Sequence, residues 1–150
     1  IMRTLSKVGL AGSRFGLLIG DPAWVDQLDK LRLPYNINAL SQAAVQFALE
    51  HAEVLERQSA AIRDERARLH AALQARNLTV WPSEANFLIA LIPDGRAREV
   101  FEGLKRHGVL VKCLDGSHPM MANALRVTVG APHESDALLS ALDQLLGGGR

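Results

Sequence analysis

The feature that most constrains the fold is a long stretch, residues 38–76, that contains neither glycine nor proline. The stretch is rich in alanine, a strong helix former. Leu55, Ile62 and Leu69 recur every seven residues, and Leu73 follows one helical turn later. This spacing places the apolar side chains along one face of a helix. The pattern therefore predicts one long helix, or one that is broken once.

The other faces of this predicted helix carry charged side chains of both signs. They are Glu56, Arg57, Arg63, Asp64, Glu65, Arg66 and Arg68. Interspersed charges of both signs are typical of a solvated helix surface. The whole chain has a formal net charge of only +1, so it offers no extended positive field to a phosphate backbone. We therefore expect these side chains to face solvent, and we expect no nucleic acid partner.

The region before this helix is a glycine-rich turn held between short strands. Residues 2–5 and 15–19 are the strand candidates, and the turn covers residues 7–16. Gly20, Asp21 and Pro22 then supply a breaker, a capping side chain and a proline suited to the first helical position. A helix over residues 22–31 is the consequence.

The region after the long helix alternates between strand and helix patterns. Strands are predicted over residues 78–81, 86–92, 109–113 and 125–129, and helices over residues 96–107 and from Pro132 onward. The last helix carries Leu138, Leu142 and Leu145 along one stripe. We expect helices on one face of a sheet, in a compact α+β unit.

The length and composition indicate a folded piece of a larger protein. With 150 residues, 48% hydrophobic and 22% charged, the chain can bury one ordinary core. It is much shorter than an enzyme that closes two domains over a cofactor. Its opening residues lack the pattern of a signal peptide, and methionine stands second. We therefore expect a fragment that was cut inside a longer sequence.

The cysteine and histidine content and the lengths of the apolar runs limit the compartment and the partners of the chain. Cys113 is the single cysteine and cannot form an internal disulfide, so the cytosol is the default location. No apolar run approaches the length of a membrane span, so we expect no membrane partner. The histidines have no metal-ligand spacing, and we predict no metal. They are His51, His70, His107, His118 and His133.

The segment that carries chemistry is residues 6–16, with the sequence SKVGLAGSRFG. A nucleotide-binding phosphate loop places its lysine after the glycine turn and before a hydroxyl residue, and here the order differs. The amine of Lys7 can condense with an aldehyde to form a Schiff base, and a cationic neighbour such as Arg14 favours its neutral form. Arg14 and the Ser6 hydroxyl suit a phosphate group. These residues fit an aldehyde cofactor that bears a phosphate.

The same segment resembles the cofactor-lysine signature of the fold-type I, aspartate-aminotransferase-like enzymes that use pyridoxal 5'-phosphate. Residues 3–7, RTLSK, look most like the histidinol-phosphate branch of that family. The resemblance implies that Lys7 is the catalytic residue and binds the cofactor covalently, while Ser6 and Arg14 bind its phosphate. In many relatives the arginine lies eight positions after the lysine. In this chain it lies seven positions after the lysine, and the shorter turn resembles part of the histidinol-phosphate branch.

The resemblance continues along the chain. Residues 86–88 (NFL) and 108–111 (GVLV) look like strand motifs of the family's small domain, and residues 125–130 (LRVTVG) look like the strand whose arginine binds the substrate's anionic group. Strand alternation independently places Leu125, Val127 and Val129 on a core face, and Arg126 on the other. We therefore expect Arg126 to bind substrate. Asn86 is either structural support or a ligand contact.

The resemblance implies an α/β fold: the last strands of a large-domain sheet, a linking helix and an α+β small domain. Residues 1–38 would end the large cofactor-binding domain, and residues 39–150 would form the linking helix and small domain. The implied activity is transamination from histidinol phosphate to 2-oxoglutarate in histidine biosynthesis, by a homodimer. Other cofactor-contacting residues of the family lie upstream of the lysine, so the fragment alone would bind cofactor weakly and would not turn over.

Three alternatives remain open at this stage. Another aminotransferase, or a decarboxylase of the same fold, would share the lysine signature. An aminotransferase-like regulatory domain of a transcription factor would bind the cofactor without turnover, although no basic helix for DNA is visible in the sequence. An inactive interaction domain is the third.

Overall fold

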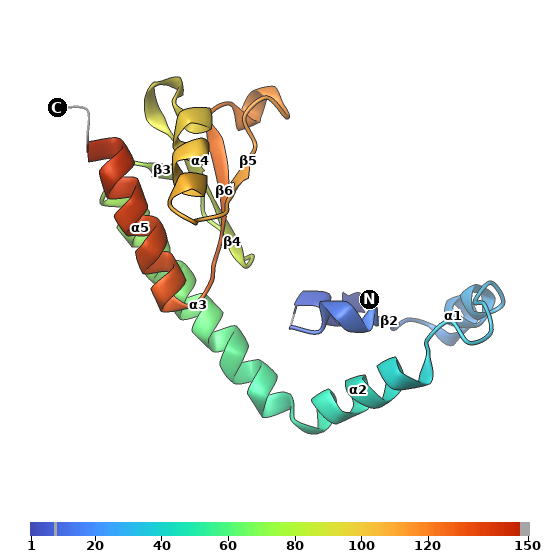
Figure 1. Cartoon of the computed structure of the whole chain (residues 1–150). Coiled ribbons are helices and arrows are strands. Elements are labelled where there is room, and N and C mark those ends of the chain that lie inside the picture. The colour runs from blue at the N-terminus through green and yellow to red at the C-terminus, as the bar shows by residue number, and fades with distance from the viewer. Residues whose placement is uncertain (8, 148–150) are drawn as a thin grey trace. The chain divides into compact units, whose positions relative to one another are not determined.

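The computed structural model describes residues 1–7 and 9–147. Its internal contacts divide into two units, Ile1–Ala60 and Ala61–Arg150. Figure 1 shows the elements in chain order, from the short strands near the N-terminus to α5 near the C-terminus. The division falls inside α3 (Ala52–Gln74), so this helix contributes residues to both units.

The first unit begins with two short antiparallel strands, β1 (Met2–Thr4) and β2 (Gly16–Leu18). Met2 lies opposite Leu18, and Thr4 lies opposite Gly16. Two 3-10 turns, at Leu5–Lys7 and Ala11–Ser13, lie between the strands. The predicted arrangement of strand, glycine-rich turn and strand is therefore confirmed.

The next two helices, α1 (Pro22–Asp29) and α2 (Ala39–Glu50), begin at side chains that cap their first N–H groups. The Asp21 carboxylate accepts a hydrogen bond from the Ala23 N–H at 2.8 Å, and the Asn38 side-chain oxygen accepts one from the Ser41 N–H at 2.8 Å. A break at His51 separates α2 from α3. The stretch without glycine or proline thus forms a once-broken helix, one of the two predicted forms.

The second unit contains an antiparallel sheet of four strands in the order β3-β4-β6-β5. These strands are β3 (Thr79–Val80), β4 (Phe87–Leu91), β5 (Lys112–Cys113) and β6 (Ala124–Thr128). The strand expected over residues 109–113 is wrong for residues 109–111. The Val109 N–H donates to the Leu104 carbonyl at 2.9 Å, so the chain is still bound to the preceding helix there and reaches the sheet only at Lys112.

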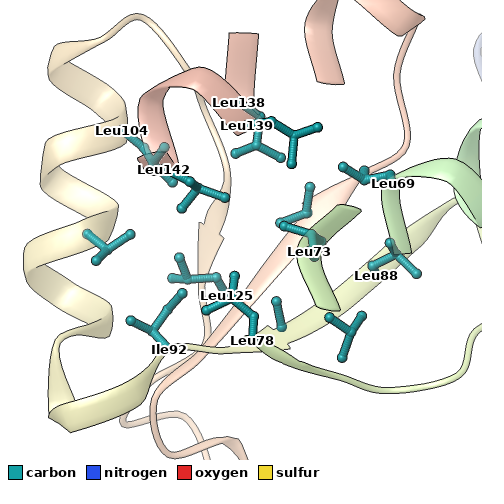
Figure 2. Packing of buried hydrophobic residues seen from close by; sticks show 14 of the residues in the cluster. Leu69, Leu73, Leu78, Leu88, Ile92, Leu104, Leu125, Leu138, Leu139 and Leu142 are labelled. Carbon is teal, nitrogen blue, oxygen red and sulfur yellow. The ribbon is translucent and has the colours of Figure 1, made fainter. Parts of the chain in front are cut away.

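Three helices cover one face of this sheet: α3, α4 (Ala97–Arg106) and α5 (Pro132–Gly147). Figure 2 shows their leucines packed against the sheet. Leu73 of α3, Leu104 of α4 and Leu142 of α5 belong to the same hydrophobic cluster as Leu125 of β6, and all four are almost completely buried. The helix-covered face is the apolar face that strand alternation predicted. Within the described residues, no helix is long and apolar enough to cross a membrane.

One charged residue departs from the solvated surface expected for α3. Glu65 is only 7% exposed, because α5 packs over this part of the helix. The Arg68 guanidinium donates to both Glu65 carboxylate oxygens, at 2.8 and 2.9 Å, and also to Asp136 of α5 at 2.8 Å. Hydrogen bonds from Arg68 lower the pKa of the Glu65 carboxyl, although burial opposes this shift. The ion pair therefore joins two helices of the core.

We expect a Glu65→Gln substitution to destabilise the full-length protein by about 1–3 kcal/mol, because it removes the charge that Arg68 contacts. The pKa of Glu65 is lowered in the fold, so its contribution is present above the ordinary value of 4.5 and is lost as the pH falls through the folded-state pKa. Urea unfolding midpoints at neutral and acidic pH measure this. Asp64→Asn, an exposed neighbour, is the control. An equal change in both variants would contradict a special role for Glu65.

Candidate functional site

The glycine-rich turn is closed by backbone hydrogen bonds at its base. The Leu5 N–H donates to the Phe15 carbonyl at 3.2 Å, directly beyond the β1–β2 ladder, and the Leu10 N–H donates to the Leu5 carbonyl at 3.2 Å. Ser6 follows Leu5 and Arg14 precedes Phe15, so each is adjacent in sequence to the Leu5–Phe15 closure. Ser6 and Arg14, two of the three predicted cofactor-binding residues, therefore lie beside the hydrogen bond that closes the turn.

Ser6 and Lys7 lie at the end of the first 3-10 turn, Leu5–Lys7. The Thr4 hydroxyl donates to the Ser6 hydroxyl oxygen at 3.0 Å, and the Ser6 N–H donates to the Thr4 hydroxyl oxygen at 3.1 Å. This local pair orients Ser6. Lys7 is exposed, and its amine makes no hydrogen bond to any other described residue. The amine is thus accessible to an aldehyde.

Arg14 has a left-handed backbone, with φ at 53°, which is uncommon for a residue other than glycine. Its guanidinium makes one long hydrogen bond, from Nη1 to the Ala11 carbonyl at 3.5 Å. Its other donors are unused within the part of the chain that the structure describes. A strained backbone is often found at ligand-binding positions, and free guanidinium donors suit an anion.

The small residues of the turn leave space around these groups. Gly9 has φ at 94°, a conformation that favours glycine. A Cβ on Gly12 would meet nothing within 4 Å, so packing inside this unit gives no reason for glycine there. An amine, a hydroxyl, a guanidinium and open backbone on one turn fit a phosphorylated aldehyde.

The predicted substrate residue Arg126 lies on β6, in the second unit. Leu125 and Val127, its neighbours in the strand, are buried at 1% and 4% exposure, whereas Arg126 is half-buried on the opposite face. The alternation predicted for this strand is confirmed. Thr128 is exposed and, by the same alternation, shares the Arg126 face. We name this side, which carries Phe87, Ile89, Lys112, Arg126 and Thr128, the open face of the sheet.

Lys112 is a candidate that sequence reasoning missed. It is the direct cross-strand partner of Arg126 in the β5–β6 register, and direct partners in an antiparallel pair project to the same face. Two cations opposite each other repel, and neither forms an ion pair with any described residue. An anion bound between them would remove this repulsion. Strand alternation along residues 109–113 could have shown that Lys112 lies on the opposite face from Val111 and Cys113. Only the β5–β6 register shows that Lys112 lies directly opposite Arg126.

Asn86, the other predicted substrate residue, directly precedes β4. Its carbonyl accepts a hydrogen bond from the Val129 N–H at 2.9 Å, so its backbone extends the β4–β6 pairing. Its side chain is exposed and makes no hydrogen bond to Arg126 or to any other described residue. This backbone contact does not involve the Asn86 side chain, so structural support and ligand contact both stay predictions for that side chain.

Two hollows, one in each unit, do not include the predicted site residues. In the first unit, a cavity of about 700 Å³ is lined by Phe15, Arg32, Asn36, Ile37, Gln42, Val45, Gln46, Leu49 and Glu50. It includes none of Ser6, Lys7 or Arg14. In the second, a cavity of about 420 Å³ is lined by residues 108–111, by the end of β6 and by the start of α5. Among the described residues, no group of three metal-binding side chains occurs.

Comparison with known proteins adds a family match. The family described as aminotransferase class I and II matches residues 1–145. Histidinol-phosphate aminotransferase from Chromobacterium violaceum is 52% identical over 145 residues, which cover 96% of this chain and 40% of that protein. The chain thus spans about two fifths of the length of this relative.

Solved structures agree in fold. Histidinol-phosphate aminotransferase from Sinorhizobium meliloti, in complex with pyridoxal-5'-phosphate, superposes with a TM-score of 0.82 at 27% identity, covering 97% of this chain and 40% of that one. A decarboxylase from Sulfurospirillum multivorans superposes with a TM-score of 0.79 at 26% identity, covering 97% and 43%.

Proposed function

Because this chain belongs to the class I and II aminotransferase family, we propose that the full-length protein transfers an amino group from histidinol phosphate to 2-oxoglutarate in histidine biosynthesis. The observation that carries the proposal is the 52% identity to a histidinol-phosphate aminotransferase over 145 residues. The expected fold class, part of the fold-type I architecture, is confirmed by the superposition on solved aminotransferases.

The proposed cofactor is pyridoxal 5'-phosphate, and the turn of residues 6–14 is its proposed site. When bound, the cofactor supplies an aldehyde for the amino group and a ring that withdraws electrons from the substrate's α-carbon. Lys7 would hold it covalently through Nζ and, once released, would move the proton at the α-carbon. Ser6 and Arg14 would donate to its phosphate. The exposed amine and the unused Arg14 donors support this assignment.

The proposed substrate-anion site is the cation pair of Lys112 and Arg126. The planar guanidinium of Arg126 can bind a carboxylate or phosphate through two parallel hydrogen bonds, and the ammonium of Lys112 adds a second positive charge. The two cations face each other in the β5–β6 register and have no ion-pair partner among residues 1–7 and 9–147, which supports this role. Asn86, at the end of the same sheet, is retained as a proposed substrate contact.

The proposed domain organisation follows the family resemblance. Residues 1–38 would complete a large cofactor-binding domain, and residues 39–150 would form a linking helix and the small domain. We also propose a cytoplasmic homodimer. The apolar surface of the first unit supports contact with further polypeptide, because side chains such as Trp24, Leu31 and Phe47 are 75%, 79% and 64% exposed.

The test is an aminotransfer assay on the full-length protein with histidinol phosphate and with histidinol, its unphosphorylated analogue. We expect turnover that depends on 2-oxoglutarate. The KM for histidinol phosphate should be at least about tenfold lower than the KM for histidinol, because a charged hydrogen-bonded contact contributes roughly 1.5–3 kcal/mol. Release of carbon dioxide from an amino acid substrate would instead indicate a decarboxylase. Cofactor binding without turnover of any amino donor would indicate a regulatory domain.

A further inference from the structure

Arg126 is held differently from three other half-buried arginines of the second unit. Arg66, Arg76 and Arg96 each donate to a carboxylate, from Glu84, Asp143 and Glu99 respectively. The Arg126 guanidinium carbon instead lies 5.4 Å from the centre of the Phe87 ring. Within the described residues it has no carboxylate partner. Its side chain is therefore placed by an aromatic ring.

The strand register explains this contact. Phe87 lies opposite Thr128, and Ile89 lies opposite Arg126, in the antiparallel β4–β6 pair. Phe87 and Arg126 are consequently diagonal neighbours on the open face, a separation that aromatic and long side chains can bridge. A cation within about 6 Å of a ring centre is attracted by the negative face of the ring.

A ring and a carboxylate have different consequences for a bound arginine. A carboxylate neutralises the guanidinium charge and occupies its N–H donors, as Glu99 does for Arg96. A ring does neither, so the donors remain available to a ligand. Lys112, opposite Arg126, would otherwise favour side-chain conformations that turn Arg126 away. Attraction to the ring opposes this repulsion.

We propose that Phe87 is a positioning residue that holds Arg126 ready for the substrate's anionic group while leaving its charge and donors free. This inference rests on the proposed function, because it assumes that Arg126 binds substrate. It adds that substrate affinity depends on an aromatic side chain at position 87, which contacts the arginine and not the reacting atoms.

The test uses the full-length holoenzyme with Phe87→Leu and Phe87→Met, which remove the ring, and Phe87→Tyr, which keeps it. We expect the two variants without the ring to raise the KM for histidinol phosphate about two- to fivefold with little change in kcat. Phe87→Tyr should keep the KM at the wild-type value. The inhibition constant of inorganic phosphate, which reports anion binding without turnover, should rise in parallel. Ile89→Leu, an aliphatic exchange on the same face, is the matched control.

The Arg126→Gln variant separates anion binding by Arg126 from positioning of Arg126 by Phe87. If Arg126→Gln leaves the KM and the phosphate inhibition constant unchanged, the proposed anion site is wrong. If it raises both while the aliphatic Phe87 variants raise neither, only the positioning role is wrong. In the Arg126→Gln background, Phe87→Leu should have no further effect. A full additional effect there would show that Phe87 acts independently of Arg126 and would overturn the inference.

Discussion

Replacing Lys7 with alanine in the full-length protein is expected to abolish aminotransfer, with kcat reduced at least about a thousandfold. The amine that would hold the cofactor and move the proton at the substrate's α-carbon is absent from this variant. Alanine is small and Lys7 is exposed, so we expect little change in folding. The loss should therefore reflect chemistry and not stability.

Two measurements check the Lys7→Ala prediction. Steady-state assays give kcat, and the visible absorption of the purified protein shows whether the cofactor is still bonded to lysine. Lys30→Ala is the matched control, because the Lys30 amine donates to the Gln27 side chain at 2.8 Å and lies outside the turn. Wild-type turnover and absorption in Lys7→Ala would remove the assignment of this turn to the cofactor.

The second large effect concerns the core of the second unit. Leu73→Ala should destabilise the protein by about 2–5 kcal/mol, the usual cost of a cavity left by a buried leucine. Leu73 has no exposed surface and packs where α3 meets the sheet (Figure 2). Alanine is the best helix former, so a change in helix propensity cannot explain the loss.

Urea unfolding followed by circular dichroism measures this effect. Leu110→Ala is the control, because Leu110 is 80% exposed and truncation of a surface side chain usually changes stability by no more than about 0.5 kcal/mol. Equal unfolding midpoints for the two variants would contradict the packing in which α3, α4 and α5 share one core with the sheet.

Local patterns in the sequence predicted most of the elements correctly. Helix starts at Asp21 and Asn38 follow from capping side chains, which act on N–H groups two or three residues away. The two faces of β6 follow from strict alternation along the strand. The proposed cofactor turn, residues 6–16, could be recognised for the same reason, because its small residues, hydroxyl, amine and guanidinium are close in the sequence.

The errors arose where long-range packing decides. Residues 109–111 are of types that favour strands. They do not join the sheet, because the Val109 N–H is hydrogen-bonded to the end of α4. Glu65 belongs to a run of charged residues that is predicted to be solvent-exposed. In the structure α5 covers Glu65, and Arg68 compensates its charge. Neither outcome depends on the neighbouring residues alone, since each requires a partner from a distant part of the chain.

The sequence by itself thus determined the helices, the faces of the central strands and the family, and it is the basis of the chemistry proposed for the Lys7 turn. Only the tertiary structure decided that Lys112 faces Arg126 and that Phe87 lies against the Arg126 guanidinium. Local periodicity specifies which side of a strand a residue occupies, whereas the pairing register specifies which residue stands beside it. That register is determined by burial of Leu88, Leu125 and Val127 against the helices. This burial depends on many contacts between distant parts of the chain.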